Sequence, residues 1–172
     1  MEHGPATTVV VIGVSGSGKT TVAEALAART GWPFLEGDDV HPAANVAKMR
    51  AGRPLDDADR RPWLQELARR IDEHEAAGRS VVVTCSALKR AYRQTLADGH
   101  PSVVFVQVDV PRELLAQRMA RRAGHYMPAS LLQSQLDAFE PLQPDEPGVV
   151  LDGMASPDDV VARLLSALPR LK

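Results

Sequence analysis

Short apolar segments alternate along the chain with longer segments in which apolar residues recur every three or four positions. The short segments are rich in valine and are bounded by turn residues. Unbroken apolar runs of this kind are typical of strands that are buried on both faces of a parallel sheet. The predicted strands are Thr8–Ile12, Ser80–Thr84 and Val103–Val108, with two weaker ones at Pro33–Leu35 and Val149–Leu151.

The segments between the strands have the periodicity of helices. In the longest of them, Trp63, Leu67 and Ile71 follow one another at intervals of four residues. A proline opens one of the others and an N-capping serine opens another. The predicted helices are Thr20–Arg29, Asp59–Ala77, Pro111–Arg122, Ala129–Phe139 and a last one after Ser156. Strands separated by helices predict right-handed βαβ units, and therefore an α/β fold in which helices cover the sheet.

The composition limits the classes of protein to which this chain can belong. Its length of 172 residues corresponds to about one domain. With 44% hydrophobic and 24% charged residues it has an ordinary globular mixture, which argues against a disordered chain. A net charge of −2 argues against a general nucleic-acid binder, which usually carries a basic surplus.

The same observations lead us to expect a cytoplasmic protein. Cys85 is the only cysteine, which excludes an intramolecular disulfide and fits a reducing compartment. The longest apolar runs are far shorter than the ~20 residues that span a bilayer, and the polar start of the chain lacks the pattern of a signal peptide. We therefore expect neither a membrane nor a nucleic acid among its partners.

One motif carries specific chemistry. Gly13–Thr20 reads Gly-Val-Ser-Gly-Ser-Gly-Lys-Thr and matches the phosphate-binding loop (P-loop) pattern G-x-x-x-x-G-K-[ST] in full. It follows a predicted strand and opens a predicted helix, which is the context that such a loop requires. Its backbone N–H groups and the helix N-terminus suit a polyphosphate, Lys19 can reach the β- and γ-phosphates, and Thr20 can ligate Mg²⁺. The motif predicts ATP or GTP binding; the alternative is a glycine-rich structural turn.

Other nucleotide-binding classes fit less well. A GTPase needs a guanine-reading N-K-x-D motif, but Asn45 is the only asparagine and Val46 follows it. A D-x-x-G switch motif occurs only at Asp145–Gly148, late in the chain and outside the expected context. The chain is also small for a motor ATPase. Small-molecule kinases are the class that remains.

Two adjacent carboxylates follow the second predicted strand, Asp38 and Asp39. Ligands of open α/β sheets bind at the carboxyl ends of the strands, so this pair is well placed for phosphoryl transfer. One carboxylate could accept the proton of an attacking hydroxyl while the other organises Mg²⁺ or binds hydroxyls. The third strand ends in Thr84-Cys85-Ser86, without the carboxylate that often organises Mg²⁺ at this position. Organising Mg²⁺ would therefore fall more heavily on Asp38 and Asp39. The alternative is helix capping or a solvated turn.

Basic residues follow on both sides of the long helix. The polar segment 45–63 contains glycine and proline, which predict a connection rich in both charges, suited to an anionic, hydroxyl-rich acceptor. Lys89 and Arg93 are four residues apart and share a helix face, where they could bind an acceptor carboxylate or phosphate. An exposed basic helix face is the alternative. Cys85 is interpreted as a small buried residue rather than a nucleophile.

Three arginines near a helix end precede a Gly-His-Tyr-Met-Pro break and a second helix. Arginines on a mobile segment can close over transferring phosphates, so we interpret the region as a helical lid. The alternative is that they complement the helix dipole. The arginines are Arg118, Arg121 and Arg122.

Taken together, these segments resemble the gluconate kinase (gluconokinase) family of P-loop kinases. The resemblance rests on Gly13–Thr20, on the run GDDVHPAANVAKMRAGRPLDDADRRPWL at Gly37–Leu64, on CSALKRAYR at Cys85–Arg93 and on RRAGHYMPASLLQSQLDAFEPL at Arg121–Leu142. It implies transfer of the γ-phosphoryl group of ATP to the 6-hydroxyl of D-gluconate, with Mg²⁺. It also implies a nucleoside-monophosphate-kinase-like three-layer sandwich with a five-stranded parallel sheet, one domain over residues 1–172 with a lid at about 121–140, and a cytoplasmic homodimer.

The resemblance and the motifs together give a set of expected site residues. Lys19, Asp38, Asp39 and Arg122 are the candidate catalytic residues, and Thr20 and Asp38 the candidate metal ligands. The candidate nucleotide contacts are Gly13, Val14, Ser15, Gly16, Ser17, Gly18, Lys19, Thr20, Arg118 and Arg121. The candidate gluconate contacts are Asp38, His41, Lys48, Arg53, Arg60, Lys89 and Arg93. Rival functions are a kinase for shikimate, a nucleoside monophosphate or another sugar acid, a nucleotide-binding regulator, and an acceptor-independent ATPase.

Overall fold

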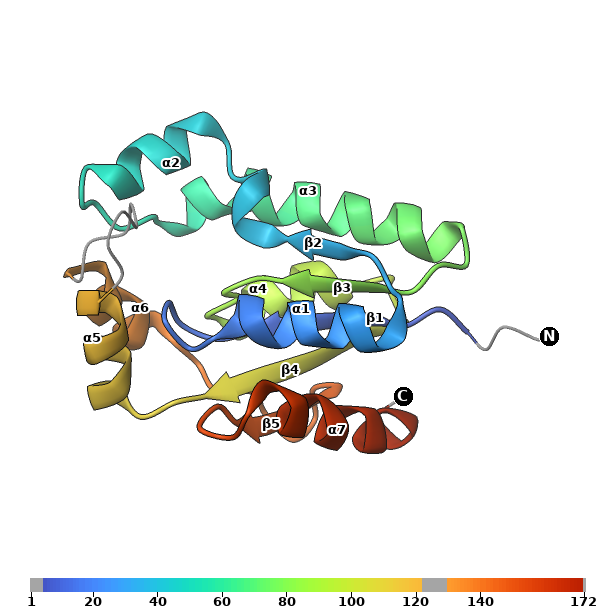
Figure 1. Cartoon of the computed structure of the whole chain (residues 1–172). Coiled ribbons are helices and arrows are strands. Elements are labelled where there is room, and N and C mark those ends of the chain that lie inside the picture. Colours follow the sequence, from blue (N-terminus) through green and yellow to red (C-terminus); the bar gives the residue numbers. More distant parts are fainter. Residues whose placement is uncertain (1–4, 122–129, 172) are drawn as a thin grey trace.

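A parallel sheet of five strands forms the centre of the protein, with the strand order β2-β3-β1-β4-β5 (Figure 1). The computed structural model describes residues 5–121 and 130–171. The strands are β1 (Thr8–Ile12), β2 (Phe34–Glu36), β3 (Val81–Thr84), β4 (Val103–Asp109) and β5 (Gly148–Asp152). All five predicted strands are confirmed, with no end shifted by more than one residue, and so is the α/β class.

The central strand explains why the apolar runs are unbroken. β1 pairs with β3 on one side and with β4 on the other, so that Thr8 is in register with both Val81 and Val103. Val9 and Ile12 on this strand are fully buried, as are the residues between them. A strand covered on both faces and both edges has no solvent-facing positions, so it shows no alternation of apolar and polar residues.

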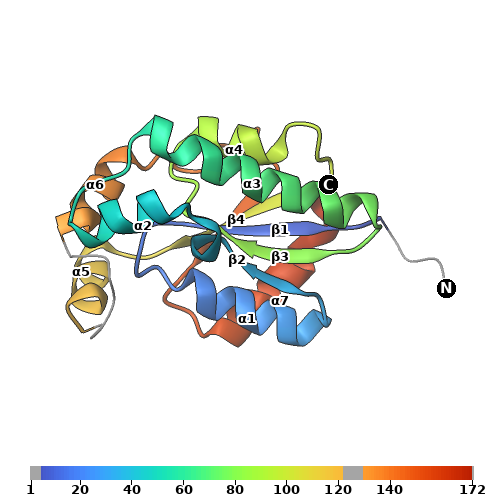
Figure 2. The ribbon, with the colours of Figure 1, turned by 90° about the horizontal axis from the view of Figure 1, so that it is seen from above.

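Helices cover both faces of the sheet. Figure 2 shows α1 and α7 on one face and α3 and α4 on the other, which gives the expected three layers. The helices are α1 (Lys19–Thr30), α2 (Ala43–Arg50), α3 (Asp57–Ala76), α4 (Arg90–Ala97), α5 (Arg112–Arg121), α6 (Ser130–Ala138) and α7 (Pro157–Ala167), with 3₁₀ turns at η1 (Gly37–Val40) and η2 (Leu168–Arg170). Within the described ranges, no helix combines the length and apolar character needed to cross a membrane.

Helix α2 differs from the prediction. Segment 45–63 was expected to form a connection because of its glycine and prolines, but its first residues are helical. Pro42 lies at the N-cap of α2, where its missing N–H is harmless, and Gly52 follows the helix with a left-handed φ of 77°. Only Asn45 and Met49 of α2 are buried. Two buried positions are too few to produce a clear helical period in the sequence.

The start of α7, which was predicted from an N-capping serine, is confirmed. The side chain of Ser156 accepts a hydrogen bond from the backbone N–H of Asp159 at the start of α7. Helix α3 begins two residues earlier than expected because Asp56 and Asp59 form a reciprocal capping box. Helices α2, α5 and α6 gather at the carboxyl ends of the strands (Figure 1), which is where ligands bind in such sheets.

Candidate active site

The P-loop lies between β1 and α1, as predicted. Gly16 and Gly18 have φ angles of 83° and 91°, which belong to the left-handed region that favours glycine. The ammonium group of Lys19 lies across the loop and donates hydrogen bonds to the carbonyl oxygens of Gly13 and Val14, at 2.9 and 3.1 Å. This keeps the lysine charge at the loop, where it faces the space that a polyphosphate would occupy.

A hollow beside the loop has polar walls and carries negative as well as positive side chains. Its lining combines the P-loop and the start of α1 with the end of β2 and with η1: Ser15, Gly16, Gly18, Lys19, Thr20, Thr21, Glu36, Asp38, Asp39, His41 and Val46. We call it the phosphate-side hollow. Its position at the N-terminus of α1 suits the triphosphate of a nucleotide.

Glu36 is a functional candidate that the sequence reasoning missed. It ends β2 and pairs in register with Thr84 at the end of β3. The hydroxyl of Thr84 donates to one of its carboxylate oxygens at 2.7 Å, and the hydroxyl of Thr20 donates to the other at 2.8 Å. A carboxylate therefore does lie beside Thr20 of the P-loop, but it comes from β2, the neighbour of β3 in the sheet. A charged residue at the end of an apolar strand was the available signal, but the pairing of β2 with β3 was needed to use it.

The oxygen donors around Thr20 fit Mg²⁺. Mg²⁺ is usually held through one or two carboxylates together with substrate phosphates, rather than by a complete protein cage. The phosphate-side hollow offers the Thr20 hydroxyl and the carboxylates of Glu36, Asp38 and Asp39. Among the described residues, no three His, Cys, Asp or Glu side chains form a preassembled metal cluster.

A second pocket adjoins the first and is enclosed by α2, α3, α6 and the loop after β3. Its lining consists of Ser15, Lys19, Asp38, His41, Met49, Pro54, Leu55, Arg60, Trp63, Ser86, Leu131, Ser134 and Gln135. We call it the acceptor pocket. Of the residues that the structure describes, four line both this pocket and the phosphate-side hollow: Ser15, Lys19, Asp38 and His41. Asp39 lines the phosphate side alone, which supports the preference for Asp38 as the residue that contacts the acceptor.

Local packing explains how Asp38 reaches this junction. Gly37 directly follows β2 and approaches β3 so closely that an added Cβ would lie 1.9 Å from the carbonyl oxygen of Thr84. Its carbonyl accepts a hydrogen bond from the indole N–H of Trp63 at 2.8 Å, and its N–H donates to the hydroxyl of Thr84 at 3.0 Å. These contacts fix the start of η1, and therefore the position from which Asp38 projects.

His41 is held against the same tryptophan. Its ring stacks on Trp63 with the centroids 4.0 Å apart and the planes 17° apart. Burial, followed by the positive charge of Arg60, lowers the pKa of His41 to about 4. The imidazole is therefore neutral at physiological pH.

Arg60 is the cationic side chain that α3 contributes to the acceptor pocket. Its guanidinium donates to the carbonyl oxygen of Leu55 at 2.8 Å and to the hydroxyl of Tyr92 at 3.2 Å. Tyr92 in turn donates to the carboxylate of Asp57. An arginine anchored in this way is well prepared to bind a carboxylate.

Three of the basic residues expected to contact the acceptor lie elsewhere. Lys48 forms an ion pair with Asp59, and Lys89 forms one with Asp57 at 3.0 Å. Arg53 is exposed on the segment after α2. None of the three is among the described residues that line the acceptor pocket, so we no longer assign them to substrate binding. The sequence shows that these side chains are basic, but it does not show which way each one points in the fold.

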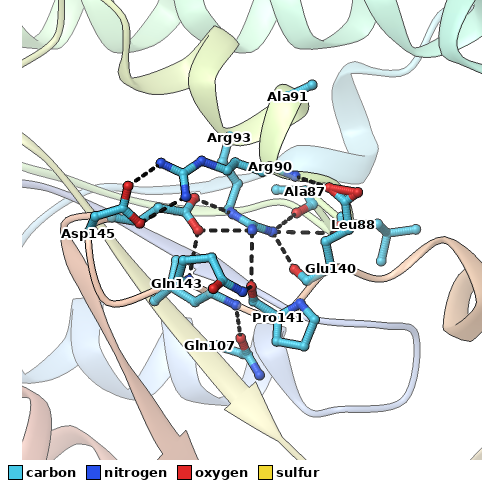
Figure 3. Close-up of polar contacts among 12 residues, drawn as sticks. Ala87, Leu88, Arg90, Ala91, Arg93, Gln107, Glu140, Pro141, Gln143 and Asp145 are labelled. Atoms are coloured by element: carbon cyan, nitrogen blue, oxygen red, sulfur yellow. Dashed lines mark hydrogen bonds and ion pairs between the residues drawn. The ribbon is translucent and has the colours of Figure 1, made fainter.

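Arg93 requires a larger correction. Its side chain is 1% exposed and forms an ion pair with Glu146, which is 7% exposed, at 2.7 Å. The remaining guanidinium N–H groups donate to backbone carbonyls of Ala87, Leu88, Glu140 and Pro141 (Figure 3). All five donors of the guanidinium are thereby used. Arg93 therefore fastens the segment after α6 to the loop after β3, and does not contact the acceptor.

Helices α5 and α6 both contact the P-loop. Arg118 of α5 donates to the carbonyl oxygen of Gly16 at 3.0 Å, and Gln135 of α6 accepts from the backbone N–H of Ser15 at 2.8 Å. Arg121 ends α5 and is exposed. Arg122 and the break that follows it lie outside the described residues.

A third hollow lies on the other side of the P-loop. It is lined by Gly16, Ser17, Gly18, Thr21, Val22, Val108, Arg118, Gly153, Ala155, Pro157 and Val160. Part of its lining, Gly153 and Ala155, comes from the loop after β5. The hollow has room beside the P-loop for the base and ribose of a nucleotide. Cys85, by contrast, is fully buried, and burial raises the pKa of its thiol to about 12. This agrees with the structural role expected for it.

Comparison with known proteins gives the family. Residues 9–142 match the family model described as "AAA domain". The chain is 51% identical to a gluconokinase of Gluconobacter oxydans over 91% of this chain and 88% of that protein. It is 44% identical to the thermosensitive gluconokinase of Escherichia coli over 82% of this chain and 75% of that protein.

Solved structures agree. A gluconokinase from Sinorhizobium meliloti superimposes with a TM-score of 0.84 at 44% identity, covering 97% of this chain and 93% of that chain. An unliganded sugar kinase from Janibacter gives a TM-score of 0.89 at 50% identity, covering 97% of this chain and 98% of that one. An APS kinase of Mycobacterium tuberculosis, at 21% identity and a TM-score of 0.72, shares the fold. With its P-loop, its two adjoining pockets and these relatives, the chain belongs to the gluconokinase family of P-loop kinases.

Proposed function

We propose that this protein transfers the γ-phosphoryl group of ATP to the 6-hydroxyl of D-gluconate, giving 6-phospho-D-gluconate and ADP. The observation that carries the proposal is the junction of the two pockets. Lys19 and Asp38 line both the phosphate-side hollow and the acceptor pocket. A phosphoryl group held at Lys19 and a hydroxyl held at Asp38 would therefore meet at one place.

The step assigns one task to each residue at the junction. Asp38 accepts the proton of the 6-hydroxyl, whose oxygen attacks the γ-phosphorus while the bond to the β,γ-bridging oxygen breaks. Lys19 and the P-loop amides hold the phosphates, and Arg118 adds positive charge from α5. Mg²⁺, when bound, neutralises phosphate charge. Thr20 and Glu36 would hold it, with Asp38 in the same hollow.

The acceptor pocket matches a linear polyhydroxy acid. Arg60 supplies a fixed guanidinium for the carboxylate, and His41, Ser86 and Ser134 supply polar groups for hydroxyls. Trp63 and Met49 give the pocket apolar surface for the carbon chain. In this orientation the carboxylate lies toward Arg60 and the 6-hydroxyl toward Asp38.

ADP release from purified protein with Mg²⁺-ATP tests the proposal. It is measured with D-gluconate and without an acceptor, beside shikimate, AMP and glucuronate, and the product is identified by mass spectrometry. Release that depends strictly on gluconate is expected. Release without an acceptor would identify an ATPase, and tight ATP binding without release would favour a regulator. A Lys19→Ala sample purified in parallel controls for contaminating kinases.

Three further properties belong to the same proposal. The family resemblance supports a Mg²⁺ requirement, a cytoplasmic location and a homodimer. The contacts of α5 and α6 with the P-loop support a lid over about residues 121–140 of a single kinase domain. Titration of activity with EDTA and Mg²⁺ tests the metal, and light scattering at several protein concentrations tests the dimer.

A further inference from the structure

Asn45 lies between α3 and the acceptor pocket and makes two hydrogen bonds there. The residue is 4% exposed. Its Nδ2 donates to the backbone carbonyl of Asp59 at 2.9 Å and lies 3.2 Å from Nδ1 of His41. A carbonyl oxygen can only accept, so the contact with Asp59 fixes which end of the amide is the nitrogen. The second N–H of that nitrogen is then donated to His41.

This hydrogen bond determines where His41 carries its proton. An Nδ1 atom that accepts a hydrogen bond has no proton, so the proton of the neutral imidazole is on Nε2. Nε2 lies 3.9 Å from the nearer carboxylate oxygen of Asp38, which is too far for a direct hydrogen bond. Because His41 and Asp38 both line the two adjoining pockets, the Nε2–H group faces the place where the acceptor hydroxyl would lie.

We propose that Asn45 is a positioning residue for phosphoryl transfer. By holding His41 in the Nε2–H tautomer, it lets the imidazole donate a hydrogen bond to the acceptor hydroxyl next to Asp38, while Asp38 takes the proton of that hydroxyl. This inference rests on the proposed function and adds to it a residue that touches neither substrate.

Asn45→Asp tests the role with almost no change in shape. Its carboxylate accepts where the amide donated, so it favours a proton on Nδ1 and leaves Nε2 without the N–H that would donate to the acceptor hydroxyl. We expect kcat with gluconate to fall by about tenfold or more. A kcat close to that of the unaltered protein would overturn the proposal.

A second background separates this role from a structural one. In His41→Gln the side-chain amide can keep an N–H donor near the position of Nε2 and has no second tautomer. Adding Asn45→Asp to this variant should change kcat less than about twofold, because there is no imidazole tautomer left to shift. If Asn45 served only to pack α2 on α3, the substitution would cost the same factor in both backgrounds.

NMR of the unaltered protein gives an independent readout. Histidine labelled with ¹⁵N reports the protonation of each ring nitrogen, and His41→Gln identifies the His41 signals among the five histidines. We expect an unprotonated Nδ1 and a protonated Nε2. The opposite tautomer or an imidazolium overturns the inference even if gluconate is phosphorylated. The expected tautomer in a protein that fails to phosphorylate gluconate would instead reject the proposed function, and the acceptor contact with it.

Discussion

The side-chain oxygen of Gln135 accepts a hydrogen bond from the backbone N–H of Ser15, with the two atoms 2.8 Å apart. One residue belongs to α6 and the other to the P-loop, 120 positions earlier in the chain. Gln135 also lines the acceptor pocket. Helix α6 therefore contacts both the loop that holds the nucleotide and the pocket that holds the acceptor.

Gln135→Ala should lower kcat/KM for gluconate by about tenfold and raise the share of ATP that is hydrolysed without transfer. The physical reason is that the shorter side chain no longer fills the space between α6 and the P-loop. Water can then enter the acceptor pocket and reach the bound phosphates. The measurement is the ratio of ADP to phosphorylated gluconate. Gln133→Ala on the exposed side of the same helix is the matched control and should keep a ratio near one.

Asp38→Asn and Asp39→Asn form a matched pair. Asp38 lines both pockets and Asp39 only the phosphate side. We therefore expect the first substitution to lower kcat by about 10²–10⁴-fold, the usual contribution of a general base, and the second to have a much smaller effect. Binding of ATP, measured by calorimetry, should be retained in both. Equal losses of kcat would show that Asp38 has no special role in proton transfer.

Glu36→Gln should raise the Mg²⁺ concentration that gives half-maximal activity by about 10–100-fold, the range for groups that orient or support a metal site. Its carboxylate is joined to Thr20 and Thr84, so the amide keeps the shape but loses the charge. Activity is titrated with Mg²⁺ at fixed ATP. Glu24→Gln on the exposed side of α1 is the control, and a similar shift in that variant would argue for a general charge effect.

Arg93→Met should destabilise the protein by about 3–5 kcal/mol, because it leaves the carboxylate of Glu146 buried and unpaired. The neighbouring Arg90 pairs with Asp145 at the surface, with side-chain exposures of 38% and 68%. Arg90→Met should therefore cost at most about 1 kcal/mol. Urea unfolding monitored by circular dichroism measures both values. Comparable losses would mean that the buried cluster in Figure 3 is no more important than a surface ion pair.

The ion pair of Arg93 and Glu146 predicts part of the loss of folding stability in acid. Burial raises the pKa of Glu146. Hydrogen bonds from Arg93 and from the backbone of Gln143 lower it by more than burial raises it, so the pKa lies below the ordinary 4.5. A carboxyl group whose pKa is lower in the folded state stabilises the fold above its unfolded pKa. That stabilisation is lost as the pH falls from about 4.5 through the folded pKa. The loss should be visible in the unaltered protein and absent from Arg93→Met.

The basic residues show where reading the sequence was insufficient. The spacing of Lys89 and Arg93 indicated a helix, and α4 does lie there, although Lys89 is its extended N-cap residue. Spacing alone does not say which groups a side chain contacts. Arg93 meets Glu140, Pro141 and Glu146, which are 47 to 53 positions away. Helix α2 was missed because only two of its residues are buried.

The sequence by itself determined the five strands, the capped start of α7 and the P-loop. These depend on local properties: unbroken apolar runs, capping side chains, and glycines that tolerate a positive φ. Only the tertiary structure decided that Glu36 lies beside Thr20, that Asp38 rather than Asp39 faces both pockets, and that Asn45 orients His41. These relationships depend on strand register and on contacts between α2, α3 and the sheet. Such contacts join residues far apart in the chain, and the local pattern around each residue does not encode them.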